Sequence, residues 1–269
     1  MSFLSGGVAV VTGAASGIGR ALAQRLSATG SALALADIDE KGLAETAASL
    51  SNKAGAISTH VVDVSDESRV KSFSGEVLAK HGRVSLLINN AGVALHGTFD
   101  EISLDDFRWL MGINFWGTVY GVRYFLPALK KEPRAHIVNL SSVFGIIAPV
   151  GQSAYSTSKF AVRGFTESLR HELAGTTVNV SAVHPGGIQT PIAVHARTGA
   201  NAPKNAKEHS VAMLARLART SADEAAARIL RGVERREPRI LIGSDARRID
   251  LLQRLKPATY WKTMAKMVK

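Results

Sequence analysis

The sequence predicts an α/β protein with a parallel sheet that is covered by helices on both faces. Short apolar runs alternate with helical stretches over the first 190 residues. The runs are apolar almost throughout, which suits strands that are buried on both faces. A β-α-β-α order implies a parallel sheet joined by right-handed crossovers.

The expected elements follow one another at short intervals. Helical stretches occupy 19–30 and 39–52. The runs that we expect to form strands are 8–13, 32–37, 57–64, 84–92, 136–142 and 178–186, with one more at 239–243. We find no internal repeat and no low-complexity linker, so residues 1–269 are predicted to form a single domain.

Two segments depart from this alternation. Residues 187–220 hold Gly, Pro, Asn and His before any helical pattern settles, so we expect a mobile lid over a substrate. Residues 246–269 follow the last strand and are predicted to form a basic helical extension. One helical stripe of that extension carries Tyr260, Trp261, Met264, Met267 and Val268.

The composition is that of an ordinary soluble globular protein, with 20% charged residues and a mean hydropathy near zero. The chain has no cysteine, which excludes disulfides and thiolate chemistry. We find no signal peptide and no apolar run of transmembrane length, so the expected location is the cytoplasm, with peripheral membrane contact as an option. The net charge of +11 is concentrated at one end, because residues 196–269 hold 17 Lys and Arg against 7 Asp and Glu.

Three glycines mark a candidate nucleotide site. Gly13, Gly17 and Gly19 follow the first strand and open a helix. Glycine lets the backbone approach a pyrophosphate, and the helix N-terminus offers unpaired N–H groups. A tight strand-to-helix turn without a ligand is the alternative interpretation.

Asp37 strengthens the nucleotide interpretation, because it ends the second strand. An acid there accepts hydrogen bonds from the adenosine ribose and repels a 2′-phosphate. No Lys or Arg lies at 13–19 or at 38 to receive such a phosphate. We therefore predict NAD as the cofactor, with NADP disfavoured. The alternative role for Asp37 is to cap the next helix.

Two further strand ends are expected to border the cofactor, because ligands lie at the carboxyl ends of strands in such sheets. Asp63 and Val64 end the third strand, and "NNAG" at 89–92 ends the fourth. We expect Asn90, Ala91 and Gly92 to line the groove. For Asn89, a bond to neighbouring backbone is at least as good an interpretation.

Tyr155 and Lys159 are the candidate catalytic pair. Their spacing puts both on one face of a helix. A cation close to a phenol favours the phenolate and is expected to lower its pKa, which suits general acid–base catalysis near neutral pH. Taken alone, the spacing also fits a solvated helix face.

Two more polar residues are expected beside this pair. Ser142 follows the "NLSS" strand and lies 13 residues before Tyr155. A hydroxyl there can bind a substrate oxygen. Asn114 supplies an amide that can hold a water beside Lys159, or can instead bond local backbone.

Together these motifs resemble the short-chain dehydrogenase/reductase family, over residues 7 to about 190. The signatures are "TGAASGIG", Asp37, Asp63, "NNAG", Asn114, Ser142, "YSTSK" and "PGGIQT". The resemblance implies a doubly wound, Rossmann-like sheet of about seven strands. It also implies a tetrad in which Tyr155 is the acid–base, Lys159 binds the nicotinamide ribose, Ser142 polarises the substrate and Asn114 anchors a water.

The same resemblance bears on two further residues and on the remaining cofactor contacts. Ser141 is the alternative to Ser142 as the serine of the tetrad. His184, before the proline, departs mildly from the family pattern, and we expect a structural role for it. We expect no metal. Besides the residues already named, the expected NAD contacts are Ser16, Ile18, Ile38, Tyr155, Lys159, Pro185, Gly186, Ile188 and Thr190.

The substrate pocket is expected to be apolar. Residues 93–96, 143–152 and 187–215 should form it, and they carry few charges near the active end. We therefore predict an apolar alcohol or ketone as the substrate. The residues expected to contact it are His96, Phe144, Val150, Ile192 and His195.

The basic C-terminal extension leaves three interpretations open. It packs on its own domain or a sister subunit, it lies on an anionic membrane surface, or it is a solvated tail. No nucleic-acid motif accompanies the charge, so we expect no nucleic-acid partner. The family resemblance implies a homodimer or homotetramer. The alternative function is a non-catalytic, NAD-binding regulatory or membrane-associated scaffold protein on the same fold.

Overall fold

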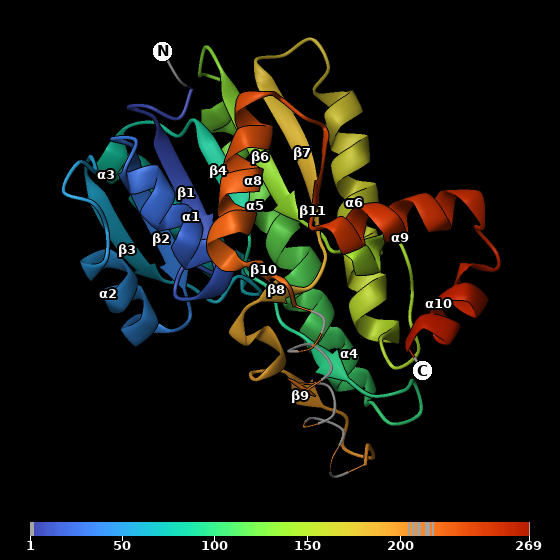
Figure 1. Cartoon of the computed structure of the whole chain (residues 1–269). Helices are drawn as coiled ribbons and strands as arrows, with labels where there is room; N and C mark the ends of the chain where they lie inside the picture. Colours follow the sequence, from blue (N-terminus) through green and yellow to red (C-terminus); the bar gives the residue numbers. More distant parts are fainter. Residues whose placement is uncertain are drawn as a thin grey trace.

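A seven-stranded parallel sheet forms the centre of the computed structural model, in the order β11-β7-β6-β4-β1-β2-β3 (Figure 1). The structure describes residues 3–203, 205, 208, 211–212, 216 and 218–268. Every pairing within this sheet is parallel. The strands are β1 (Val8–Thr12), β2 (Ala32–Asp37), β3 (Ile57–Val61), β4 (Leu86–Asn89), β6 (Ala135–Leu140), β7 (Val178–Pro185) and β11 (Arg239–Ile242). The predicted doubly wound α/β fold is confirmed.

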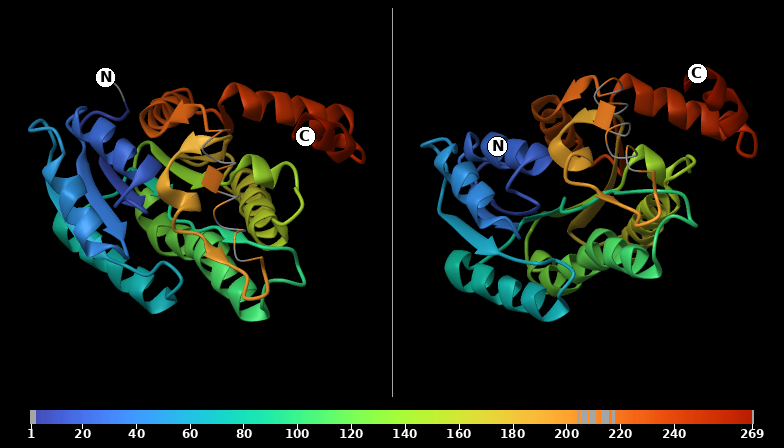
Figure 2. Two further views of the ribbon diagram at one scale, coloured as in Figure 1. Left: turned by 60° about the horizontal axis from the view of Figure 1, so that its bottom comes forward. Right: turned by 90° about the horizontal axis from the view of Figure 1, so that it is seen from below.

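Helices cover both faces of the sheet, as Figure 2 shows. The helices that precede the C-terminal extension include α1 (Gly17–Ser27), α2 (Glu40–Ala48), α3 (Glu67–His81), α4 (Leu104–Met111), α5 (Gly117–Leu129), α6 (Ser153–Glu172) and α8 (Ala222–Glu234). Alternate residues of β1 point to opposite faces: Ala9 and Val11 join one core with α1 and α8, and Val8 and Val10 join a second core with α3, α5 and α6.

The third strand corrects one prediction. β3 ends at Val61 instead of residue 64, and its residues are alternately exposed and half-buried. These residues are exposed because β3 lies at the edge of the sheet, where only β2 pairs with it. Asp63 and Val64 therefore lie in the loop beyond the strand.

The first two helices also differ from their predicted bounds. α1 begins at Gly17, two residues before the expected start, so Gly17 and Gly19 lie within its first turn. α2 begins after Asp39, whose side chain accepts a hydrogen bond from the Gly42 N–H. Asp39 is therefore the helix cap, and Asp37 is left for another role.

One short parallel ladder joins the two ends of the predicted lid at 187–220, and a second ties an internal part of it to the segment after β4. β8 (Ile188–Gln189) pairs with β10 (Thr220–Ser221), and β9 (Arg197–Thr198) pairs with β5 (Leu95–His96). A 3-10 turn, η3 (Pro191–Ala193), lies between them. Much of the centre of the predicted lid, at 204, 206–207, 209–210, 213–215 and 217, lies outside the described residues.

The C-terminal extension consists of two helices, α9 (Ser244–Leu255) and α10 (Tyr260–Val268), which are separated by a turn at Pro257. The Tyr260 hydroxyl accepts a hydrogen bond from the Ala148 N–H at 2.9 Å, so the extension contacts its own domain. Tyr260, Trp261 and Met264 are half-buried, whereas the side chains of Met267 and Val268 lie outside the described part. Across the described ranges, no helix is both long and apolar enough to cross a bilayer.

Candidate active site

The predicted site residues gather at the carboxyl ends of the central strands. β1, β4, β6 and β7 are neighbours in the sheet, and each is followed by one of the motifs singled out in the sequence. In a parallel sheet these ends meet along one edge, where loops and helix N-termini converge.

The glycine turn after β1 has the shape of a phosphate cradle. Gly13 and Gly17 have φ of 65° and 52°, which disfavours residues with a Cβ. A methyl group at Gly19 would lie 2.0 Å from the Gly13 carbonyl oxygen, so only glycine allows the helix to approach the turn. Ser16, the exposed residue before α1, makes no side-chain cap bond to the helix. The first N–H groups of α1 therefore remain available to an anion.

Asp37 closes this cradle at the end of β2. One carboxylate oxygen accepts a hydrogen bond from the Ala15 N–H at 2.9 Å, and the other accepts from the Asp39 N–H at 3.1 Å. The side chain is therefore held in place beside the glycine turn. Ile38 next to it is 67% exposed, which leaves an apolar surface beside the carboxylate. These residues fit the adenosine end of a dinucleotide.

The loop after β4 lies against the glycine turn. The Asn90 amide donates to the carbonyl oxygens of Thr12 and Gly13 at 2.9 and 3.0 Å. Asn90 therefore holds the cradle together with its side chain. Among the described residues, Asn89 does not bond neighbouring backbone through its amide group; the amide donates instead to the Asn139 side chain on the adjacent strand at 2.8 Å. Asp63 is exposed and accepts hydrogen bonds from Ser65, while Val64 is buried.

Lys159 is almost fully buried on α6. Its ammonium group donates a hydrogen bond to the Leu140 carbonyl oxygen at 3.0 Å, and burial lowers the pKa of Lys159 to about 8. A methyl group at Gly92 would lie 3.4 Å from Nζ, so the loop after β4 and the lysine are neighbours. The ammonium group thus lies where the β4 and β6 ends meet.

Tyr155 lies one turn before Lys159, and its ring centroid is 5.7 Å from Nζ. Burial raises the pKa of Tyr155 to about 12, and a hydrogen bond with Ser142 partly opposes this rise. The predicted lowering of the phenol pKa by Lys159 is therefore wrong for the protein alone. The desolvation penalty on the phenolate exceeds what the lysine supplies at this distance.

The two neighbouring serines have different surroundings. The Ser141 hydroxyl donates to the Lys159 carbonyl oxygen at 2.8 Å and is buried. The Ser142 hydroxyl accepts from the Phe144 N–H at 3.1 Å and is close enough to Tyr155 to influence its titration. Ser142, rather than Ser141, therefore faces the phenol.

Asn114 lies on a short π-helix, η1 (Gly112–Trp116), between α4 and α5. Its side chain accepts from the Val93 N–H at 2.8 Å and donates to the Val93 carbonyl oxygen at 3.0 Å. It also donates to the Ser158 hydroxyl at 3.1 Å. These partners lie in the loop after β4 and on α6 rather than in the local backbone of η1, so Asn114 fixes the loop beside Lys159. The water-anchoring role stays a prediction. The sequence offered no signal for Ser158 beyond its place in "YSTSK".

The segment after β7 is tied to α9. The Gly187 N–H donates to Asp245 at 2.7 Å, and a methyl group at Gly186 would clash with the same carboxylate. Thr190 contacts the glycine turn, since a methyl group at Gly17 would lie 3.2 Å from its Cγ2. Pro185 ends β7. Ile188, in contrast, is buried among core residues, so its side chain belongs to the core rather than to a groove.

His184, the departure from the family pattern, is fully buried at the end of β7. Its Nδ1 donates a hydrogen bond to the Ser142 carbonyl oxygen at 2.9 Å. Burial lowers the pKa of His184 to about 4, so the ring is neutral at pH 7. The expected structural role is what the geometry supports.

The predicted substrate residues differ in their placement. The Phe144 ring packs edge-on against Tyr155, with 6.0 Å between centroids. His96 lies near Gln152, with 3.4 Å between the Nδ1 atom of His96 and the Nε2 atom of Gln152. Val150 is 72% exposed, Ile192 is half-buried and His195 is exposed. An open groove near the last two is lined by Val194, Glu208, Val211 and Ala212 among the described residues.

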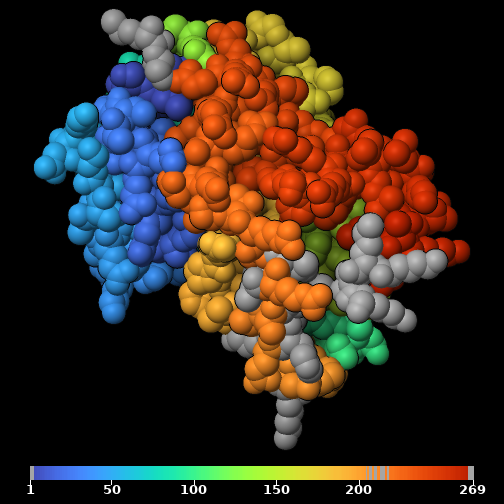
Figure 3. Space-filling model, viewed as in Figure 1, coloured from blue at the N-terminus to red at the C-terminus, as the bar shows by residue number. Residues whose placement is uncertain are grey.

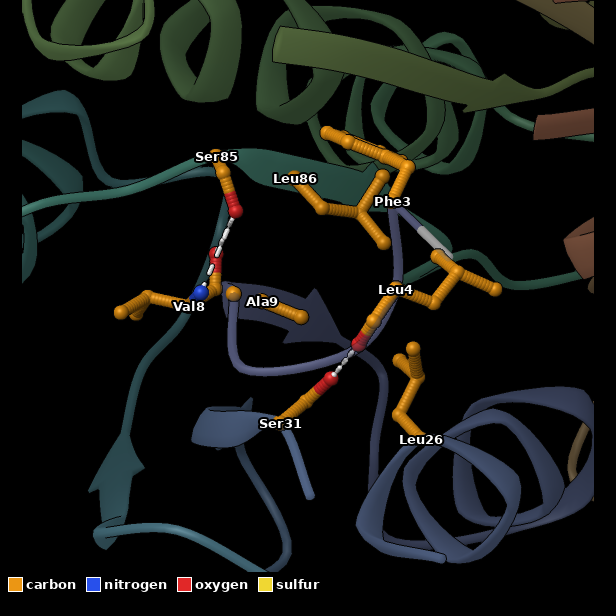
Figure 4. Close-up of a pocket in the computed structure, with 9 residues that line it drawn as sticks. Phe3, Leu4, Val8, Ala9, Leu26, Ser31, Ser85 and Leu86 are labelled. Carbon is orange, nitrogen blue, oxygen red and sulfur yellow. Dashed lines mark hydrogen bonds between the residues drawn. The ribbon is translucent and has the colours of Figure 1, made fainter. Parts of the chain in front are cut away.

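A separate small pocket lies at the amino ends of the strands, away from the candidate site at their carboxyl ends (Figure 4). Ser31, Ser85 and Val8 line it at the amino ends of their strands. There the Val8 N–H donates to the Ser85 hydroxyl at 3.1 Å, and the Ser31 hydroxyl donates to the Leu4 carbonyl oxygen. The volume of the pocket is about 10 Å³, which is enough for no more than one water molecule. It is not a substrate site.

Comparison with known proteins decides the family. The family model for short chain dehydrogenases matches residues 7–201. The chain belongs to the short-chain dehydrogenase family. SadH of Mycobacterium tuberculosis is 40% identical over 267 residues, which cover 98% of this chain and 96% of SadH.

Two solved structures show how far the likeness extends. One from Burkholderia phymatum, in complex with NAD, is 33% identical with a TM-score of 0.87, and 96% of each chain is covered. An alcohol dehydrogenase from Thermococcus sibiricus, complexed with 5-hydroxy-NADP, is 25% identical with a TM-score of 0.74; the match covers 88% of this chain and 95% of that one. This short-chain dehydrogenase is therefore an oxidoreductase on a fold that holds nicotinamide cofactors.

Proposed function

We propose that this protein is an NAD(H)-dependent oxidoreductase that interconverts an apolar secondary alcohol and its ketone, or an alcohol and an aldehyde. The observation that supports this most is the convergence of Ser142, Tyr155 and Lys159 at the carboxyl edge of the sheet. The phenol lies 5.7 Å from the ammonium group and within the influence of the serine hydroxyl.

The choice of NAD is supported by Asp37. Its carboxylate is fixed by the Ala15 and Asp39 N–H groups beside the glycine cradle. A 2′-phosphate there would meet a fixed negative charge, whereas ribose hydroxyls would donate to it. The Gly13–Gly17 turn and the open N-terminus of α1 would hold the pyrophosphate, and Lys159 would bind the nicotinamide ribose.

The bound cofactor would supply a hydride acceptor or donor, and the protein would move the proton. In the reducing direction, Tyr155 gives its hydroxyl proton to the carbonyl oxygen of the substrate as that oxygen gains negative charge. Ser142 donates a hydrogen bond to the same oxygen and holds it in place. Lys159, which keeps its positive charge at pH 7, stabilises the phenolate that remains.

An apolar substrate is supported by the side chains around the phenol. The Phe144 ring packs on Tyr155, and Val150 and Val194 are large exposed apolar residues on the two loops that flank this side. His96 and His195 would supply the polar contacts. A homodimer or homotetramer and a cytoplasmic location also remain proposals.

The test is cofactor reduction with a panel of alcohols. The purified protein is mixed with NAD or NADP and with 2-propanol, 2-octanol or 2-decanol, and absorbance of the reduced cofactor is followed. We expect turnover with NAD that rises in kcat/KM with chain length. Binding of NAD without turnover of any alcohol or ketone would favour the non-catalytic alternative, and turnover with NADP only would contradict the role of Asp37.

A further inference from the structure

The outward side of α9 is both basic and apolar. Ala246 and Asp250 point inward and are buried, and Arg239 holds Asp250 through two hydrogen bonds of 3.0 and 2.5 Å. This pairing fixes the rotation of α9 about its axis. The opposite side, which we call the α9 outer face, is formed by the exposed residues Arg247, Arg248, Leu251, Arg254 and Leu255.

The two leucines of the α9 outer face are open to solvent. Leu251 is 59% exposed and Leu255 is 72% exposed, and they lie one helical turn apart on the same side. A lone exposed leucine is ordinary on a protein surface. Here two lie together on a face that also carries Arg247, Arg248 and Arg254. The combination is typical of a helix that lies in a membrane interface.

The positive charge around these leucines is not neutralised. Residues 246–269 hold seven Lys and Arg and a single acid, Asp250. Asp250 is already engaged by Arg239 and, at 3.2 Å, by Arg254. Arg247 and Arg248 form no ion pair with any residue in the described part of the chain. The face therefore presents an uncompensated positive field.

We propose that the α9 outer face docks on an anionic lipid surface. Its arginines match lipid phosphates, and its leucines enter the boundary between head groups and acyl chains. A second copy of the chain is disfavoured as the occupant, because a two-fold contact would bring the same positive charges together. A nucleic acid would satisfy the arginines but would leave both leucines against phosphates.

The position of the α9 outer face links it to the candidate active site. Figure 3 shows the C-terminal helices, in red, as a broad part of one side of the molecule. The hydrogen bond between Tyr260 and Ala148 joins α10 to the loop between Ser142 and Tyr155. Docking would thus bring the substrate-side loop towards the lipid, where an apolar substrate dissolves. This consequence rests on the proposed function, whereas lipid binding itself does not.

Vesicle sedimentation tests the proposal without any enzyme assay. The full chain is mixed with vesicles of phosphatidylcholine alone, or of phosphatidylcholine with phosphatidylglycerol, and the bound fraction is measured. We expect binding to the anionic vesicles only, with an affinity that falls as salt is raised. Equal binding to both vesicle types, or no binding to either at low salt, would overturn the proposal.

Paired variants locate the surface. The double variant Arg247→Glu with Arg248→Glu should bind anionic vesicles at least about tenfold more weakly, because each basic residue near an anionic membrane surface contributes substantially to the free energy of binding. Leu251→Ser with Leu255→Ser should also weaken it. Lys130→Glu with Lys131→Glu makes the same charge change at exposed positions at the end of α5 and should leave binding unchanged. Circular dichroism and NAD binding show that each variant is folded.

Three other results would contradict the proposal. The control pair could reduce binding as much as the α9 pair, which would indicate a response to net charge alone. The α9 variants could instead abolish self-association in sedimentation velocity, which would assign the face to a second copy. Retention on duplex DNA that exceeds vesicle binding, and that survives the leucine changes, would assign it to nucleic acid.

Discussion

Nδ1 of His184 donates a hydrogen bond to the backbone oxygen of Ser142 at 2.9 Å, from the end of β7 to the end of β6. The bond requires the Nδ1–H tautomer, and the ring is buried and neutral at pH 7. The bond holds in place Ser142, whose hydroxyl faces Tyr155. A fully buried histidine thereby helps to place the serine that we propose acts in catalysis.

His184→Leu should therefore impair catalysis without abolishing cofactor binding. Loss of one buried hydrogen bond costs about 0.5–1.5 kcal/mol, so we expect kcat to fall up to about tenfold. His184→Asn, which can still donate to the Ser142 oxygen, should recover part of the rate. Stopped-flow and steady-state rates for both variants check this, and equal rates for the two would argue against a positioning role.

The buried His136 should make the protein less stable in acid. Its Nε2 bonds Ser181 at 2.7 Å, and burial lowers the pKa of His136 to about 3. As the pH falls below about 6.5, the unfolded chain takes up this proton while the folded protein does not. Stability is therefore full above pH 6.5 and is lost progressively from there down to pH 3.

Urea unfolding at several pH values measures this effect. His136→Gln keeps a donor for Ser181 but cannot titrate, so the slope of its unfolding free energy should be smaller by up to about 1.4 kcal/mol per pH unit. Identical slopes for the variant and the parent would show that His136 is not responsible.

Asp37 should control the choice between the two nicotinamide cofactors. Asp37→Ser removes a charged acceptor, and hydrogen bonds to charged groups contribute about 1.5–3 kcal/mol. We expect kcat/KM with NAD to fall about 10- to 100-fold, while the rate with NADP stays the same or rises. Asp39→Ser is the matched control, because it removes the same charge two residues away and keeps a helix cap. An unchanged cofactor ratio in Asp37→Ser would refute the role.

The rate of ketone reduction should fall as the pH rises through about 8. Burial lowers the pKa of Lys159 to about 8, whereas that of Tyr155 is raised to about 12, so the lysine loses its proton first. Without the ammonium charge, the phenolate formed during reduction is no longer stabilised. A pH profile of kcat/KM tests this. In Lys159→Arg the residual rate should not fall between pH 7 and 9.5, and a decline in this variant at the same pH would exclude Lys159 as its cause.

The parts of the site that were predictable are those that depend on local spacing. Tyr155 and Lys159 lie four residues apart on α6, so a helix brings them together whatever surrounds it. Gly13 and Gly17 follow a strand, and Asp37 ends the next one; the apolar runs of both strands are plain in the sequence. The strand order of the sheet then places these groups along one edge.

What sequence reasoning missed depends on contacts between distant segments. Lys159 bonds the backbone oxygen of Leu140, and Asn114 bonds the backbone of Val93; main-chain partners leave no mark in a sequence. The raised pKa of Tyr155 reflects how much protein surrounds the ring, which spacing does not report. The contact between Tyr260 and Ala148 joins residues 112 positions apart, and no local pattern indicates it.

Tyr155→Phe tests the central claim most directly. The substitution removes the hydroxyl and its proton and leaves the ring, so NAD should still bind while kcat falls by at least about 10²-fold. Tyr124→Phe, which removes an exposed hydroxyl bonded to Glu67, is the control and should keep its activity. Binding of NADH is followed by fluorescence, and turnover by absorbance, with the best alcohol of the panel. A Tyr155→Phe variant with near-normal kcat would contradict the account.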